Sequence, residues 1–269
     1  GNGDGTFEAA LFTDRDYTEY NSFLLRSSGQ DGVYTRMRDS LLTDLADDTS
    51  VYYQKTELCV VYIDGIYWGQ YNMREHISTY SICQFESWEG QEDDIDLVKA
   101  NSNVMQGSNE TYADLLDWVD SHNTNTDESY AHIGSVIDIQ NFIEYMSVEI
   151  FTGNTDTLNV KRYRNASDDG LWRWCLFDLD WAFYTNTNSI QRWLTAGGMG
   201  NGNRTNNDLF IACMKNDRFR DEFLTYFGEQ LATTYSTENV LSMIEERYNA
   251  LLPELPAQFA KWGQTESEY

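Results

Sequence analysis

The stretch GLWRWCLFDLDWAF, residues 170–183, places two carboxylates in a run that otherwise has the composition of a buried strand. Asp178 and Asp180 lie among Leu, Phe and Trp residues, and an unpaired charge is costly to bury in such surroundings. Side chains alternate between the two faces of a strand, so both carboxylates are predicted to project from one face, about 6 to 7 Å apart at Cα. A compensating partner is therefore expected beside them.

Two kinds of partner can compensate like charges near a core. The first is a divalent metal, which takes hard oxygen ligands. The second is a set of protein groups, in which one aspartate caps a loop and the other pairs with an arginine such as Arg162 or Arg173. The spacing of Asp178 and Asp180 leaves both interpretations open.

A short polar segment upstream favours the metal. A helix with an apolar face is predicted from an N-cap at Asp138 to a stop at Gly153. Asn154, Asp156 and Asn159 follow it, directly before a predicted hairpin that ends in the aspartate pair. Protein kinases use the same order of a hydroxyl-orienting Asp, a metal-binding Asn and a later metal-binding Asp. The interval from Asp to Asn is three residues here, shorter than the five of the kinase signature.

The rest of the chain indicates an α+β fold. Asp64 and Gly65, flanked by VVYI and IYWGQY, predict a tight β-hairpin. Glu75 closes this hairpin, where it is either a solvent-facing carboxylate at a helix start or a buried partner of a cation. We expect a β-rich part over residues 1–104 and a mainly helical part over 105–269, which carries the catalytic loop and the DLD hairpin.

The charge of the chain limits its partners. The 269 residues contain 18 Lys and Arg against 44 Asp and Glu, a formal net charge of −26. Such a surface repels phosphate backbones and anionic lipid, so nucleic acid and membrane partners are not expected. No apolar run approaches the roughly 20 residues that a membrane-spanning helix needs. The acidity either keeps a secreted protein soluble or serves in part to bind divalent cations or a basic partner.

Three linked motifs resemble the CotH kinases, a family named for spore-coat protein H. They are VYIDGIYWGQYNMREHI (61–77), IDIQNFIEYMSVEIFTGNTDTLNVKRYRN (137–165) and GLWRWCLFDLDWAF (170–183), and NDRFRDEFLTYFGEQL (216–231) is similar to a further recurring segment. The likeness extends from about residue 20 to residue 263. It implies an atypical protein-kinase-like fold and a secreted or spore-associated kinase, placed outside the cell or on a spore or cell surface. Its implied cofactors are ATP and Mg²⁺ or Mn²⁺, with Ca²⁺ as an alternative ion, and its implied substrate is a protein containing Ser.

The resemblance also implies roles for individual residues. Asp156 corresponds to the catalytic-loop aspartate and Asn159 to a metal-binding residue. Asp178 and Asp180 correspond to the metal-binding aspartate, and the resemblance does not decide which of them ligates directly. Glu75 occupies the position of an acidic residue after the hairpin, and we expect it to support the nucleotide site.

The chain departs from the family near its start. Many members carry an upstream strand rich in Arg, Ser and Lys, with the pattern R..S...pKkS, and nothing here matches it. If that strand holds a phosphate-contacting cation, a chain without it is a truncated or incomplete kinase. Lys55, Lys99 and Lys161 are the nearby lysines, and Lys99 is the best placed for cofactor binding because it ends the strand-like run IDLVK. The alternative interpretation is that Lys99 is only an exposed lysine at the end of a strand.

A second functional class stays open, that of a noncatalytic module of an extracellular assembly. Such a module would bind a metal or a glycan on the same acidic cluster. Trp68, Trp172 and Trp174 could form a carbohydrate platform, although strand tryptophans are more often core residues. A thermal-shift titration separates the two classes. ATP with metal should stabilise a kinase, whereas metal alone or glycan alone should stabilise a binding module.

Overall fold

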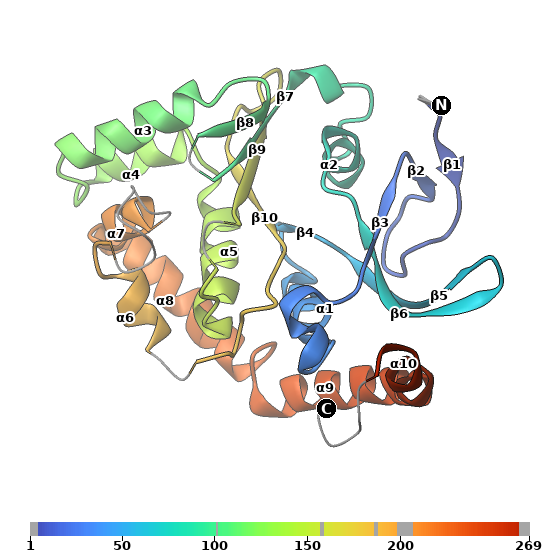
Figure 1. Cartoon of the computed structure of the whole chain (residues 1–269). Coiled ribbons are helices and arrows are strands. Elements are labelled where there is room, and N and C mark those ends of the chain that lie inside the picture. Colours follow the sequence, from blue (N-terminus) through green and yellow to red (C-terminus); the bar gives the residue numbers. More distant parts are fainter. Residues whose placement is uncertain (1–4, 101, 157–158, 186–187, 198–206, 264–269) are drawn as a thin grey trace.

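The computed structural model describes residues 5–100, 102–156, 159–185, 188–197 and 207–263. Three sheets and a largely C-terminal set of helices form an α+β fold of the kinase-like type (Figure 1). Its strands are β1 (Phe7–Glu8), β2 (Glu19–Tyr20), β3 (Phe23–Arg26), β4 (Tyr52–Tyr53), β5 (Thr56–Ile63), β6 (Ile66–Glu75), β7 (Ile95–Lys99), β8 (Asn103–Gln106), β9 (Lys161–Asn165) and β10 (Arg173–Leu176).

The α-helices are α1 (Arg38–Leu42), α2 (Thr79–Glu86), α3 (Glu110–Ser121), α4 (Asp127–Gly134), α5 (Ile139–Thr152), α6 (Ser189–Trp193), α7 (Asp208–Met214), α8 (Asp217–Ala232), α9 (Thr237–Leu251) and α10 (Leu255–Trp262). Short 3₁₀ segments are η1 (Gly29–Val33), η2 (Thr43–Ala46), η3 (Glu92–Asp94) and η4 (Leu252–Glu254). None of the helices in the described ranges combines the length and the apolar content that crossing a membrane requires.

A mixed sheet of five strands lies at the centre of the fold, in the order β4-β10-β9-β7-β8. β4 and β10 are parallel, and the other neighbours are antiparallel. The register places Lys161 of β9 opposite both Lys99 of β7 and Cys175 of β10. β7 comes from the first 104 residues, and β9 and β10 come from the remainder, so this sheet contains strands from both predicted parts. The division of the chain at residue 104 stays a prediction.

The strands β3, β6 and β5 form a separate antiparallel sheet. The predicted hairpin is confirmed, since Ile63 pairs with Ile66 and the two turn residues Asp64 and Gly65 have φ angles of 51° and 77°. Positive φ at both central residues is the signature of the tight turns that join antiparallel strands. On the other side of β6, strand β3 ends at Arg26, and the chain continues through η1 toward the candidate site.

The helix α5 is buried along most of its length and supports the candidate catalytic loop. Its predicted ends are confirmed: the side chain of Asp138 caps the first turn, and Gly153 ends the helix in the left-handed region at φ 61°. α5 packs against β10 and α8 and contributes to the main hydrophobic core. The loop at Asn154 therefore leaves a rigid element, which is what a site needs for precise placement.

The last helices return to the N-terminal sheet. α9 contacts α1, and α10 packs on β6 (Figure 1). Gln258 Oε1 accepts a hydrogen bond from Gln70 N at 2.8 Å, and Trp262 Nε1 donates to Trp68 O at 3.0 Å. Gly69, with φ 145°, leaves room for this contact, because a Cβ there would collide with Gln258. The C-terminal helix and the three-stranded sheet thus share one small interface.

Candidate active site

The side-chain amide of Asn159 joins Asp156 to Asp178. Its Nδ2 donates to Asp156 Oδ2 at 3.0 Å and to Asp178 Oδ2 at 2.7 Å. Asp156 follows α5 and Asp178 follows β10, so two loops that are separate in the sequence meet at this amide. Three of the residues predicted to form the site are therefore brought together by the fold.

Internal hydrogen bonds position the loop that carries Asp156. Asn154 is 2% exposed, and its Oδ1 accepts from the backbone N of Asp156 at 3.0 Å. The carboxyl of Glu149 is buried next to the side chains of Asn154 and Tyr145. Burial raises the pKa of Glu149 to about 7, although these two neighbours oppose the shift. Glu149 and Asn154 thus form a buried support beneath the candidate catalytic aspartate, which the sequence analysis did not identify.

The aspartate pair lies beyond the end of its strand, unlike the alternating arrangement predicted from the sequence. β10 ends at Leu176, and Asp178 takes the left-handed conformation at φ 64°. A short polar side chain such as Asp tolerates this region better than a bulky one. Phe183 N then donates to Thr152 O at 2.7 Å, which ties this loop to the end of α5. The prediction of a continuous strand through the aspartates was therefore wrong.

Arg26 compensates the charges of both aspartates. Its Nη1 lies 2.5 Å from Asp178 Oδ1, and its Nη2 lies 2.8 Å from Asp180 Oδ2. The arginines proposed from the sequence have other partners: Arg162 donates to the carbonyl of Ala100, and Arg173 pairs with Asp169, Asp138 and Glu86. An arginine does neutralise the pair, but the predicted identity of that arginine was wrong.

The two aspartates differ in their surroundings. Asp180 is 2% exposed, and its Oδ2 accepts from Arg26 and from Gln30 N at 3.1 Å. Burial and the neighbouring charge of Asp178 raise the pKa of Asp180 to about 6. The side chain of Asp178 is 19% exposed and faces Asn159 with its second oxygen. Asp178 is thus the more accessible of the two carboxylates.

A second buried aspartate, Asp39 of α1, extends this network. It accepts hydrogen bonds from Arg74 and from the backbone N of Leu179, and it also lies 3.4 Å from Arg26. Gly29 of η1 passes so close that a Cβ there would overlap Arg26 Nη2 and Asp180 Oδ2. The N-terminal turn and the loop after β10 are therefore fitted to each other.

Lys99 and Lys161 lie at the end of the five-stranded sheet next to the candidate loop. Burial and the nearby charge of Asp178 raise the pKa of Asp156, and the positive charge of Lys99 acts in the opposite direction. Lys99 is thus close enough to Asp156 to influence its ionisation. Burial lowers the pKa of Lys161, and the charge of Lys99 lowers it further.

Glu75 is placed in a different environment from this cluster. Its carboxylate pairs with Arg15 at 2.7 Å, accepts a hydrogen bond from the hydroxyl of Tyr17, and accepts another from the backbone N of Lys55 at 3.1 Å. Glu75 is 2% exposed, so of the two interpretations left open by the sequence the structure shows the buried carboxylate paired with a cation. Among the described residues, Glu75 forms no hydrogen bond or ion pair with Asp156, Asn159 or Asp178, and its role at a nucleotide site stays a prediction.

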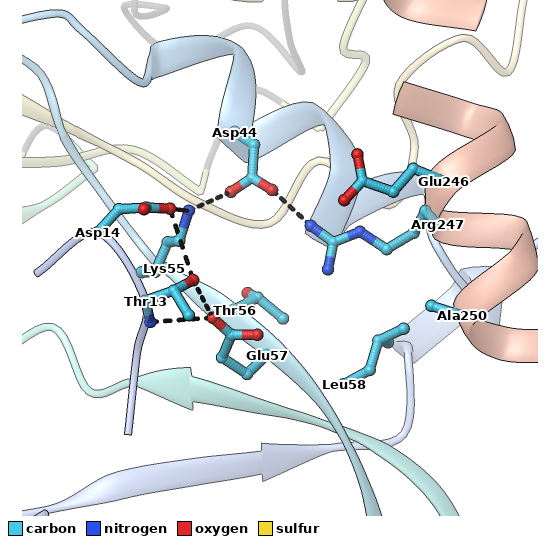
Figure 2. A pocket seen from close by; sticks show the side chains of 10 residues that line it. All are labelled: Thr13, Asp14, Asp44, Lys55, Thr56, Glu57, Leu58, Glu246, Arg247 and Ala250. Atoms are coloured by element: carbon cyan, nitrogen blue, oxygen red, sulfur yellow. Dashed lines mark hydrogen bonds and ion pairs between the residues drawn. The ribbon is translucent and has the colours of Figure 1, made fainter. Parts of the chain in front are cut away.

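A polar pocket of about 300 Å³ opens between the N-terminal segment, β5 and α9 (Figure 2). Lys55 pairs there with Asp14 at 3.1 Å and Asp44 at 3.5 Å, and Arg247 pairs with Asp44 from the side of α9. Both cations are thus engaged by carboxylates. None of the predicted site residues lines this pocket, so it offers no support for Lys55 as a phosphate-binding residue.

Comparison with known proteins identifies the family. A family model described as CotH kinase protein matches residues 6–269, essentially the whole chain. The chain belongs to the CotH kinase family. The comparison with curated proteins found no significant match. Membership of the CotH kinase family supports a kinase-like enzyme that uses ATP and a divalent metal and acts on a protein substrate.

The donor atoms of the cluster suit the metal that a CotH kinase implies. Within the described part of the chain, no group of three or more His, Cys, Asp or Glu side chains is arranged as a metal centre. Asp156, Asp178 and Asn159 nevertheless offer two carboxylates and one amide, which also carries an oxygen. Hard oxygen donors of this kind fit Mg²⁺ or Mn²⁺.

Proposed function

We propose that this chain transfers a phosphoryl group from ATP to serine hydroxyls of a protein substrate. The observation that carries the proposal is the contact of Asp156 and Asp178 through the single amide of Asn159. Phosphoryl transfer depends mainly on positioning and on charge compensation, and a small preorganised cluster of this composition supplies part of both. Family membership favours this function over a noncatalytic module.

Asp156 is proposed to orient the serine hydroxyl and to accept its proton. It stands on a loop that α5 and the buried Asn154 hold in place, and its side chain remains partly exposed. A carboxylate that must receive a hydroxyl needs both properties, a fixed direction and access from solvent. The raised pKa of Asp156, caused first by burial, also makes it a better proton acceptor.

Asn159 and Asp178 are proposed to hold the divalent metal, Mg²⁺ or Mn²⁺, with Ca²⁺ as an alternative ion. When bound, the metal supplies positive charge that offsets the charge on the transferring phosphate. Asp178 fits this role better than Asp180, because Asp180 is buried and its Oδ2 is engaged by both Arg26 and Gln30. We propose that Asp180 instead positions Arg26 and the loop that carries Asp178.

Lys99 is proposed to contact the phosphates of ATP, since its charge already acts on Asp156.

The proposed site of action, outside the cell or on a spore or cell surface, rests on the family and on the net charge of −26. A glycan platform gains little support, because Trp172 and Trp174 are 0% and 2% exposed and Trp68 packs edge-on against Trp262.

Transfer of labelled phosphate from ATP to serine-containing peptides tests the proposal, with Mg²⁺ or Mn²⁺ supplied separately. The substitution Asp156→Ala should reduce transfer by about 100-fold or more while the fold persists. Asp93→Ala, at an exposed carboxylate in η3, is the matched control and should retain the wild-type rate. Transfer by Asp156→Ala at the wild-type rate would remove Asp156 from the mechanism. A wild-type chain that binds no ATP with either metal would reject the kinase proposal.

A further inference from the structure

Two of the five lysines of this acidic chain stand directly opposite each other in the central sheet. Lys99 ends β7, Lys161 begins β9, and the two residues are cross-strand partners. Opposite residues on antiparallel strands share one face, with β-carbons about 5 Å apart. The two lysine side chains therefore project from the same face at one end of the sheet.

Neither lysine has the acidic partner that the composition would lead one to expect. The chain carries 44 Asp and Glu against 18 Lys and Arg, yet among the described residues neither Lys99 nor Lys161 forms an ion pair. The ammonium of Lys161 lies 3.5 Å from the carbonyl oxygen of Ile77 and 5.2 Å from the ring centre of Phe177. Like charges opposite each other weaken a sheet, so an uncompensated pair is a cost to the fold.

The position of the pair relates it to the candidate active site. Asn159 precedes Lys161 by two residues, and Phe177, which contacts Lys161, directly precedes Asp178. The charge of Lys99 also reaches Asp156. Two lysines that form no ion pair with any described residue thus border the cluster proposed to act on ATP, where an anionic ligand would relieve their repulsion.

We infer that Lys161 is a second phosphate-binding residue, which together with Lys99 holds the polyphosphate of the nucleotide. Only the identity of the anion rests on the proposed function, because the paired lysines are a property of the sheet itself. A lysine acts on phosphate as a point charge and does not require the planar geometry of arginine.

Isothermal titration calorimetry without metal, using ATP and inorganic tripolyphosphate as separate probes, tests the inference. Lys161→Met removes the charge and keeps the length of the side chain, and Lys161→Arg restores the charge. Lys215→Met, at an exposed lysine after α7, is the control for the overall loss of one positive charge. We expect Lys161→Met to weaken binding of both probes about tenfold or more, Lys161→Arg to recover most of the affinity, and Lys215→Met to leave it unchanged.

The outcomes separate this inference from the proposed function. Wild-type affinity for both probes in Lys161→Met, with circular dichroism showing an intact fold, would overturn the inference and leave the kinase proposal standing. If Lys161→Met does not fold, Lys99→Met removes the other charge of the pair, and wild-type affinity for both probes in that variant would overturn the paired-lysine site. Tripolyphosphate binding that depends on Lys161, in a chain that transfers no phosphate from ATP, would support the paired-lysine site and reject the kinase.

Discussion

Arg26 and Asp178 form an ion pair of 2.5 Å where the end of β3 meets the loop after β10. The same guanidinium pairs with Asp180 at 2.8 Å, and the other oxygen of Asp178 faces Asn159. A metal bound to Asp178 would therefore neutralise the same carboxylate that Arg26 neutralises. Substitutions around this pair can separate charge compensation from catalysis.

Replacing Arg26 should destabilise the fold and strengthen its response to metal. Arg26→Gln leaves Asp178 and Asp180 without their cation, and the loss of one partner from such a cluster should lower the free energy of unfolding by about 2 to 3 kcal/mol. Added Mg²⁺ should restore more stability to the variant than to the wild type, because it compensates the same charges. Urea unfolding with and without Mg²⁺ measures both effects.

Arg164→Gln is the matched control for this experiment. Arg164 pairs with Asp96 at 2.7 Å in the central sheet, so the variant also loses an ion pair. Its response to Mg²⁺ should equal that of the wild type. If Arg26→Gln shows no larger response to Mg²⁺ than Arg164→Gln, Asp178 is not a metal ligand.

The two aspartates should respond differently to the same substitution. Asp178→Asn is expected to abolish phosphate transfer and the stabilisation by Mg²⁺, with a stability change of about 1 kcal/mol. Asp180→Asn is expected to retain both, with transfer reduced by about tenfold at most, because its carboxylate acts through Arg26. Labelled-phosphate assays and thermal shifts on the two variants decide between them. The reverse result, with metal response lost only in Asp180→Asn, would make Asp180 the ligand.

Gly29 should tolerate no side chain. Gly29→Ala places a methyl group against Arg26 Nη2 and Asp180 Oδ2 at a residue with φ 56°. Gly170→Ala has the same backbone strain, at φ 70°, but nothing lies within 4 Å of its Cβ. We expect about 1 kcal/mol of destabilisation for Gly170→Ala and about 3 kcal/mol for Gly29→Ala, measured by urea unfolding. Equal losses in the two variants would show that the turn does not press on the ion pair.

Glu149 should make the stability depend on pH. Burial raises its pKa from 4.5 to about 7, so the folded state binds more protons than the unfolded state between these values. The contribution of Glu149 is therefore present at low pH and declines as the pH rises toward 7, by up to about 3 kcal/mol. In Glu149→Gln the free energy of unfolding should decline less steeply from pH 5 to pH 8.

In Glu149→Gln, Asp180 should still make the free energy of unfolding decline as the pH rises, because its pKa is raised to about 6. Glu245→Gln, on the exposed face of α9, is the control for removal of a negative charge. A pH profile of Glu149→Gln that coincides with the wild-type profile would show that Glu149 does not titrate in this range.

Local patterns in the sequence were sufficient to predict much of the fold and part of the site. The α5 helix and its ends follow from apolar spacing, a capping aspartate and a terminal glycine, all of which act over a few residues. The meeting of Asp156, Asn159 and Asp178 could be expected because a helix, a loop and a hairpin follow one another in the chain.

Other features depend on contacts that no local pattern encodes. Arg26 and Asp180 are 154 positions apart, so nothing near either residue identifies the other. The end of β10 at Leu176 was missed because the apolar run continues beyond it, while tertiary contacts turn the chain at Asp178. Glu149 reads as an ordinary helical residue, and only the folded structure shows that it lies beneath Asn154.

The contact of α10 with β6 has a consequence for the nascent chain. Gln258, which accepts a hydrogen bond from the backbone N of Gln70, is made 188 residues after it. Domains begin to fold while the ribosome is still at work, but this sheet cannot obtain its covering helix until translation of that distant segment is finished. Until then, the part of β6 that α10 covers in the finished fold stays exposed to solvent on the nascent chain.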